Sequence, residues 1–176
     1  MIVVERTFAV TAAPGVVLAY LRDFGNAQQW DPSVQRISRV GTGPLEPGAQ
    51  WRHVRRFLGV TTELTYTLLP AAAGRLVFHG RSEGATCTDT VSVRAVPGGS
   101  EVTYRVELEM HGLAKLATPL MKAELEKLAT DSAAAVTAAL DGLDASSVRQ
   151  FRFGAEPTRG GKPQINRLPT PAEETG

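Results

Sequence analysis

The stretch VTYRVELEMH, from Val102 to His111, decides the fold class. Apolar or aromatic residues occupy every second position from Val102 to Met110, and polar or charged residues fill the positions between them. Successive side chains of a β-strand point to opposite faces, so this alternation predicts a strand with one face in the core and the other in water. One wet face is typical of an antiparallel sheet.

The sequence before this stretch keeps the alternating pattern back to Val34, interrupted by short turn signals rich in glycine and proline. Six strands fit between these signals. Connections this short cannot hold the crossover that a parallel pair needs, so we expect consecutive strands to be antiparallel, as in a meander. The signals lie at Gly41–Gly48, Leu58–Gly59, Pro70–Gly74, Gly84 and Pro97–Gly99.

One strand and two short helices are predicted before the meander. Residues 2–10 are rich in β-branched and aromatic side chains, which favours a strand. Pro14 is well placed in the first turn of a helix that runs to Leu21. Asp23 is suited to cap a second, shorter helix that ends near Trp30, because the aspartate before Pro32 is disfavoured from helical geometry.

A long helical pattern follows the meander, with an apolar stripe from Leu113 to Leu143. Pro119 falls within it, so either the helix begins with this proline in its first turn or a kink lies there; we favour a kinked or two-part helix. Apolar residues are sparse beyond the stripe, where glycine and proline are frequent. We expect a folded domain over 1–144 and a disordered or loosely attached tail over 145–176 that folding does not require.

Composition excludes several classes of function. The chain has 176 residues and a formal net charge of +1, too small for the positive field that nucleic-acid binding uses. A single cysteine, Cys87, and three widely separated histidines argue against a metal site. No stretch has the ~20 apolar residues of a membrane span, and the first residues lack the order of a signal peptide. We therefore expect a cytoplasmic protein that is a monomer or a weak dimer.

The order of elements is that of an α+β protein whose sheet curls around its last helix. Several strings carry a more specific resemblance: Ala13–Pro14, Tyr20–Phe24, Trp30–Pro32, Phe57–Gly59, Thr62–Tyr66, Gly112–Leu116 and Pro119–Leu120. With them, residues 2–142 resemble the bacterial polyketide cyclase/dehydrase branch of the START-like (SRPBCC) superfamily. The resemblance implies a helix-grip fold, in which a curved seven-stranded antiparallel sheet surrounds a long C-terminal helix. It also implies a ligand cavity between the sheet and that helix, and no cofactor.

The alternation of the strands predicts which side chains face the cavity. An apolar pocket with a few placed polar groups is the usual form of a small-molecule site. We expect an aromatic and aliphatic lining, with Trp30 covering the mouth. The predicted ligand-binding residues are Trp30, Trp51, Tyr66, Phe78, Tyr104, Leu108, Met121 and Leu125.

Three inward polar residues, His53, Arg55 and Asp89, are the candidate catalytic groups. A buried charge is costly unless it is paired, so we expect Asp89 to meet Arg55 or His53 directly or through water. Alternatively, Asp89 is a structural partner of nearby amides and Arg55 reaches solvent. A slip of one residue in this strand would replace Arg55 with Arg56 on the inner face.

Three functions remain open at this stage. The first is the binding of a polyketide-, lipid- or quinone-like molecule, the second is cyclase or dehydrase catalysis, and the third is an interaction made by the tail. In aromatase/cyclases of the superfamily, the resemblance implies an inward arginine near the end of the strand that here spans residues 62–69. This sequence has Leu68 at that place, so the binding function is preferred, although Arg55 and His53 could supply the missing acid.

Overall fold

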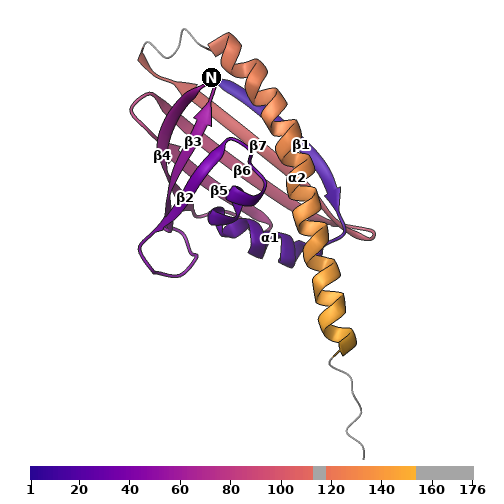
Figure 1. The fold of residues 1–176 in the computed structure, drawn as a ribbon. Helices are drawn as coiled ribbons and strands as arrows, with labels where there is room; N and C mark the ends of the chain where they lie inside the picture. Colours follow the sequence, from indigo (N-terminus) through magenta and orange to yellow (C-terminus); the bar gives the residue numbers. More distant parts are fainter. Residues whose placement is uncertain (113–117, 154–176) are drawn as a thin grey trace, which may run out of the picture.

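Seven strands and three helices form within the residues that the computed structural model describes, 1–112 and 118–153. Figure 1 shows their arrangement. In chain order they are β1 (Ile2–Val10), α1 (Pro14–Arg22), the 3₁₀ helix η1 (Phe24–Gln29), β2 (Val34–Val40), β3 (Gln50–Phe57), β4 (Val60–Leu69), β5 (Arg75–Arg81), β6 (Ala85–Val96), β7 (Gly99–Met110) and α2 (Thr118–Phe153).

The strands form one antiparallel sheet in the order β1-β7-β6-β5-β4-β3-β2. Strands β2 to β7 are the predicted meander, and β1 pairs with β7 along its whole length, from Ile2 opposite Leu108 to Val10 opposite Ser100. The outer face is polar and carries exposed ion pairs such as Arg52 with Glu63, whose Nε and Oε1 lie 2.9 Å apart. The prediction of a seven-stranded helix-grip sheet with one wet face is confirmed.

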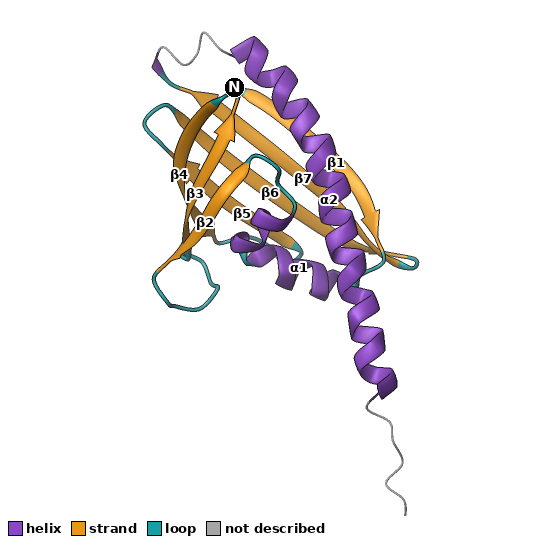
Figure 2. Ribbon diagram, in the orientation of Figure 1, coloured by secondary structure: helices purple, strands orange, loops and turns teal. Residues whose placement is uncertain are grey.

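All three helices lie on the inner side of the curved sheet, as Figure 2 shows. Helix α2 runs beside β1, and side chains tie the two together: Arg6 Nη2 lies 2.7 Å from Glu126 Oε2, and the Thr11 amide donates to Asp141 Oδ1 at 2.8 Å. The two short helices follow β1 as predicted. Asp23 caps η1, because its Oδ1 accepts from the Gly25 amide at 3.0 Å.

An aromatic cluster packs between η1 and the inner face of the sheet. Phe24 stacks on Phe78 with ring centroids 4.5 Å apart and lies 4.7 Å from the ring of Tyr66. Trp51 packs edge-on against Phe78, and its Nε1 donates to Asp23 Oδ1 at 3.2 Å. These side chains are almost fully buried, so this half of the inner face is solid core.

Helix α2 runs as one continuous helix from Thr118, with Pro119 in its first turn, to Phe153. The part of the predicted kinked or two-part helix that precedes Pro119 falls in residues 113–117, outside the described residues. The predicted boundary at 144/145 therefore falls inside α2, since no glycine or proline interrupts the chain between Gly142 and Gly154. Residues 113–117, and the tail from 154 to 176, lie outside the described residues.

The packing of Tyr66 yields a stability prediction. A Cβ added at Gly80, which pairs with Tyr66 across β4 and β5, would lie 2.7 Å from the tyrosine ring. We expect Gly80→Ala to lower the free energy of unfolding by about 1–3 kcal/mol, measured by urea denaturation. Gly84→Ala is the control, because a Cβ there meets nothing within 4 Å. Equal stability of the two variants would contradict this packing.

Candidate functional site

A hollow of about 70 Å³ lies between the sheet and α2. Its walls are mostly apolar and come from β1, β7 and α2, while the residues between η1 and β2 close one end. Small side chains on α2, Ala129, Ser132 and Ala133, leave the space that larger residues would fill. The apolar lining consists of Val4, Phe8, Trp30, Tyr104, Val106, Leu125, Leu128, Ala129, Ala133 and Val136.

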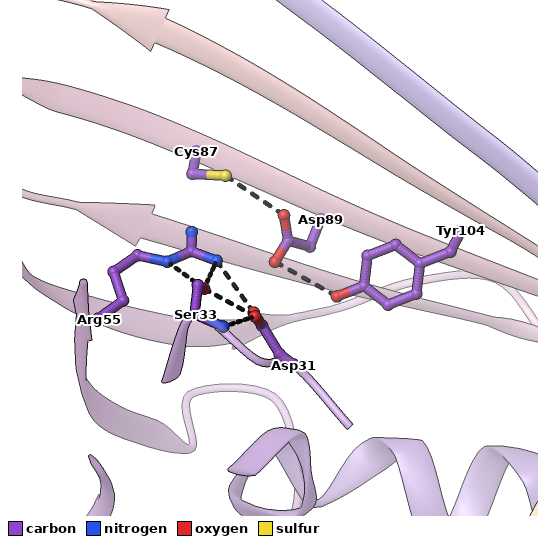
Figure 3. Close-up of polar contacts among 6 residues, drawn as sticks. All are labelled: Asp31, Ser33, Arg55, Cys87, Asp89 and Tyr104. Atoms are coloured by element: carbon purple, nitrogen blue, oxygen red, sulfur yellow. Dashed lines mark hydrogen bonds and ion pairs between the residues drawn. The ribbon is translucent and has the colours of Figure 1, made fainter. Parts of the chain in front are cut away.

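Polar groups gather at one end of the hollow around Arg55, as Figure 3 shows. Arg55 Nη2 lies 3.0 Å from Asp31 Oδ2, and Arg55 Nε and Nη2 donate to Ser33 Oγ at 3.2 and 2.9 Å. The Ser33 amide and hydroxyl in turn donate to Asp31 Oδ1 at 2.9 and 2.7 Å. Burial disfavours the charged guanidinium and is the largest single influence, but the Asp31 carboxylate, together with the weaker effects of Tyr66, Cys87 and Asp89, leaves the pKa of Arg55 raised. Arg55 is therefore a fixed cation with a carboxylate partner.

Asp89 faces the same end of the hollow with weaker partners. Its carboxylate accepts from Cys87 Sγ at 3.3 Å and from the Tyr104 hydroxyl at 3.4 Å. Burial raises the pKa values of Cys87 and Tyr104 well above their ordinary ranges, so both stay protonated and act as donors. Burial also raises the pKa of Asp89 from 3.8 to about 6, although Arg55 nearby opposes this shift. A thiol and a long phenol contact leave Asp89 with capacity for a further donor.

Trp30 brings an unpartnered donor to the lining. The side chain is 7% exposed, its ring lies 5.9 Å from that of Tyr104, and its Nε1 is buried without a hydrogen-bond partner. A buried N–H without an acceptor costs about 1–3 kcal/mol, so an acceptor that reached it would be bound favourably.

His53 is buried in the aromatic cluster rather than in the hollow. Its ring lies 5.7 Å from Phe24 and 5.4 Å from Tyr66, and neither ring nitrogen has a hydrogen-bond partner. Burial, followed by the positive charge of Arg55, lowers the pKa of His53 to about 4. The imidazole is therefore neutral near pH 7 and does not touch the hollow.

The structure separates the predicted site residues into three places. Those that line the hollow are Trp30, Arg55, Asp89, Tyr104 and Leu125. Those in the aromatic cluster are Trp51, His53, Tyr66 and Phe78. Leu108 and Met121 pack with Leu125 in a second cluster. The ligand-binding and catalytic roles of all these residues remain predictions.

The strand that carries Arg55 has the expected register, since His53 is buried while Arg52 and Arg56 are exposed. The direct ion pair of Arg55 is with Asp31, which the sequence did not predict, while the expected meeting of Asp89 with Arg55 through water stays a prediction. Asp31 and Ser33 were missed because Trp30–Pro32 was interpreted as a helix stop and as one of the strings that carry the family resemblance, and Ser33 was not considered. The sequence did contain a signal for the contact between these two residues: an aspartate two residues before a serine is a pattern that forms local side-chain turns.

Asp89→Asn should change the dependence of stability on pH. The folded protein holds the Asp89 proton up to a pKa of about 6, whereas the unfolded chain loses it near 3.8. Ionisation therefore lowers wild-type stability as pH rises from about 4 to about 6, and the asparagine variant avoids this loss. We expect the variant to gain up to roughly 2–3 kcal/mol over the wild type across that range, measured by urea denaturation.

The shift of His53 has the opposite sign, because its lowered pKa costs stability as pH falls from 6.5 to about 4. This contribution is present in both proteins and is removed when their free energies are subtracted. A difference that stays flat with pH, or that favours the wild type as pH rises, would contradict the buried carboxyl.

Two further findings concern the described residues as a whole. None of their helices combines the length and the apolar character needed to cross a bilayer. No group of three histidine, cysteine or acidic side chains among them is placed to hold a metal ion.

Several solved structures share this fold at low sequence identity. A START superfamily protein from Mycobacterium smegmatis is 14% identical with a TM-score of 0.67, and the match covers 80% of this chain and 98% of that one. The Zhui aromatase/cyclase from a Streptomyces species is 13% identical with a TM-score of 0.63, over 87% and 97% of the two chains. A Thermus thermophilus protein is 18% identical with a TM-score of 0.60, over 78% and 98%. These likenesses show the fold.

The sequence itself identifies the family. No curated protein matches the chain. The family model described as "polyketide cyclase / dehydrase and lipid transport", however, matches residues 1–146, which include every strand and every residue that lines the hollow. Together with the START-like fold of the solved structures, this match shows that the chain belongs to the polyketide cyclase/dehydrase and lipid transport family.

Proposed function

We propose that the protein binds a small hydrophobic molecule of the polyketide, lipid or quinone kind, with its polar end beside Asp89 and Trp30. The observation that carries this proposal is an apolar hollow whose lining includes two polar residues with unused hydrogen-bonding capacity, Asp89 and Trp30. Apolar walls favour a hydrophobic body, and a few placed polar groups fix its orientation.

Between them, the two polar groups can bind a hydrogen-bond acceptor and a hydrogen-bond donor of the ligand. Trp30 Nε1 is a donor without an acceptor, so a carbonyl or hydroxyl oxygen would satisfy it. Asp89 is an acceptor with weak donors, so a hydroxyl hydrogen would satisfy it. Arg55 is already held by Asp31 and Ser33 and is less free to turn toward a ligand.

The size of the hollow bears on how a ligand enters. About 70 Å³ holds several water molecules, which is less room than a fused-ring molecule needs. A larger ligand therefore requires side chains of α2, or α2 itself, to move away from the sheet. The contacts Arg6–Glu126, within β1, and Thr11–Asp141, directly after β1, restrain that motion at two places.

A second candidate is acid/base catalysis of the cyclase or dehydrase type, and the properties of Asp89 favour it. A carboxyl group with a pKa near 6, beside the Tyr104 hydroxyl, is suited to exchange protons with a bound ketone. The neutral, enclosed His53 is a poorer candidate for this role, because it does not line the hollow.

Filling the hollow should abolish binding. Ala133 lines the hollow on α2, whereas its neighbour Ala134 is exposed. We expect Ala133→Phe to weaken binding of an apolar fluorescent dye at least about tenfold, because the new ring occupies the ligand's space. Ala134→Phe is the matched control and should bind as the wild type does. Equal dye affinity of both variants, with both folded by circular dichroism, would place the binding site elsewhere.

A turnover measurement distinguishes a catalytic function from ligand binding alone. If the protein acts on a poly-ketone, Asp89→Asn should lower the rate of the chemical step by roughly 100-fold or more while the ligand still binds. The control, Glu63→Gln, removes a carboxylate from the exposed face of β4 and should leave the rate unchanged. A full rate in Asp89→Asn would exclude Asp89 as the acid or base, and absence of turnover in the wild type would leave binding as the function.

A further inference from the structure

The charged side chains around the hollow carry a net negative charge. Two arginines touch it, and each already has a carboxylate partner: Arg55 pairs with Asp31 at 3.0 Å, and Arg6 pairs with Glu126 at 2.7 Å. Asp89 is a further carboxylate, and its hydrogen-bond donors are a thiol and a phenol, neither of which carries a charge. Once the two ion pairs are set aside, one negative group remains at the polar end.

We propose that the hollow selects uncharged ligands, such as phenols, alcohols and ketones, and rejects hydrophobic carboxylates of the same size. This inference rests on the proposed function and adds the chemical class of the ligand. Asp89 is the residue that determines the selection. Arg55 would otherwise attract a ligand carboxylate, but its ion pair with Asp31 prevents this.

A ligand carboxylate would need a cation as its partner, and Arg55 is not free to supply one. Three donor contacts hold the Arg55 guanidinium against Ser33 and Asp31, and both of these partners are largely shielded from water. The Arg55 and Asp31 side chains are only 16% and 10% exposed. An anionic ligand would have to compete with Asp31 for Arg55, and displacing a buried partner leaves a buried charge unpaired.

Asp89 would also repel a ligand carboxylate. Figure 3 shows Asp89 on the same side of the Arg55 guanidinium as Asp31, with its carboxylate next to the Tyr104 hydroxyl. A ligand carboxylate placed at this end would lie beside Asp89 where water is largely excluded, and like charges repel most strongly there. A hydroxyl at the same place would instead donate to Asp89, while its oxygen accepts from Trp30 Nε1.

The test compares naphthol with naphthoate, which share one fused-ring body, need the same widening of the hollow beneath α2, and differ in the charge of the polar group. Binding to the full chain is measured by isothermal titration calorimetry at about pH 8, where Asp89 is ionised. We expect the wild type to bind naphthol at least roughly tenfold more tightly than naphthoate. Equal affinities, or tighter binding of naphthoate, would overturn the selection.

Two single substitutions test the cause. Asp89→Asn removes the negative charge and should reduce the preference for naphthol to within about threefold. Asp31→Asn keeps the turn acceptor for Ser33 but frees the charge of Arg55, and it should raise the affinity for naphthoate. The control, Glu63→Gln, makes the same chemical change at an exposed site and should keep the wild-type preference. An unchanged preference in Asp89→Asn would overturn the role of Asp89.

Failure of the charge selection can be distinguished from failure of ligand binding itself. If neither compound binds the wild type, while circular dichroism shows that the protein is folded, the proposed function fails together with the inference. If both bind with equal affinity and Ala133→Phe abolishes both, the hollow is a binding site and only the charge selection fails.

Discussion

The ion pair between Arg55 and Asp31 is the contact on which the site depends. It joins the inner face of β3 to the turn that follows η1, at a place where both side chains are largely hidden from water. Because the pair is made, the turn is held against the sheet, and Trp30, next to Asp31 in the sequence, lines the hollow. For the same reason the positive charge of Arg55 is neutralised locally, which leaves Asp89 as the unbalanced group.

The inner face of the sheet is divided into two halves with different roles. Beneath η1, the rings of Phe24, Trp51, Tyr66 and Phe78 pack into a solid core that leaves no room for a ligand. Beneath α2, small helix residues such as Ala133 leave space. The aromatic half stabilises the fold, and the half beneath α2 is the proposed ligand site, so changes in the two halves should affect stability and binding separately.

Alternation in sequence was enough to predict the strands, their antiparallel order and the inward direction of Asp89, because side-chain direction in a strand follows a fixed period. It was not enough to locate the hollow. Phe24 lies on a short helix, and its insertion between the sheet's aromatic rings depends on tertiary packing, so the sequence could not show that Trp51 and Phe78 pack in this cluster. Their ligand-binding role stays a prediction. The partner of Arg55 was missed for a similar reason, because a loop brings Asp31 across from another part of the chain.

The two tryptophans of the chain allow the account to be tested directly. Trp51 Nε1 already donates to Asp23, whereas Trp30 Nε1 has no acceptor. In a ¹⁵N-labelled protein titrated with naphthol, the account predicts that the indole N–H resonance of Trp30 moves downfield as it gains a hydrogen bond, while that of Trp51 stays nearly fixed. A shift confined to Trp51, or saturable binding that moves neither resonance, would contradict a polar ligand group at this end of the hollow.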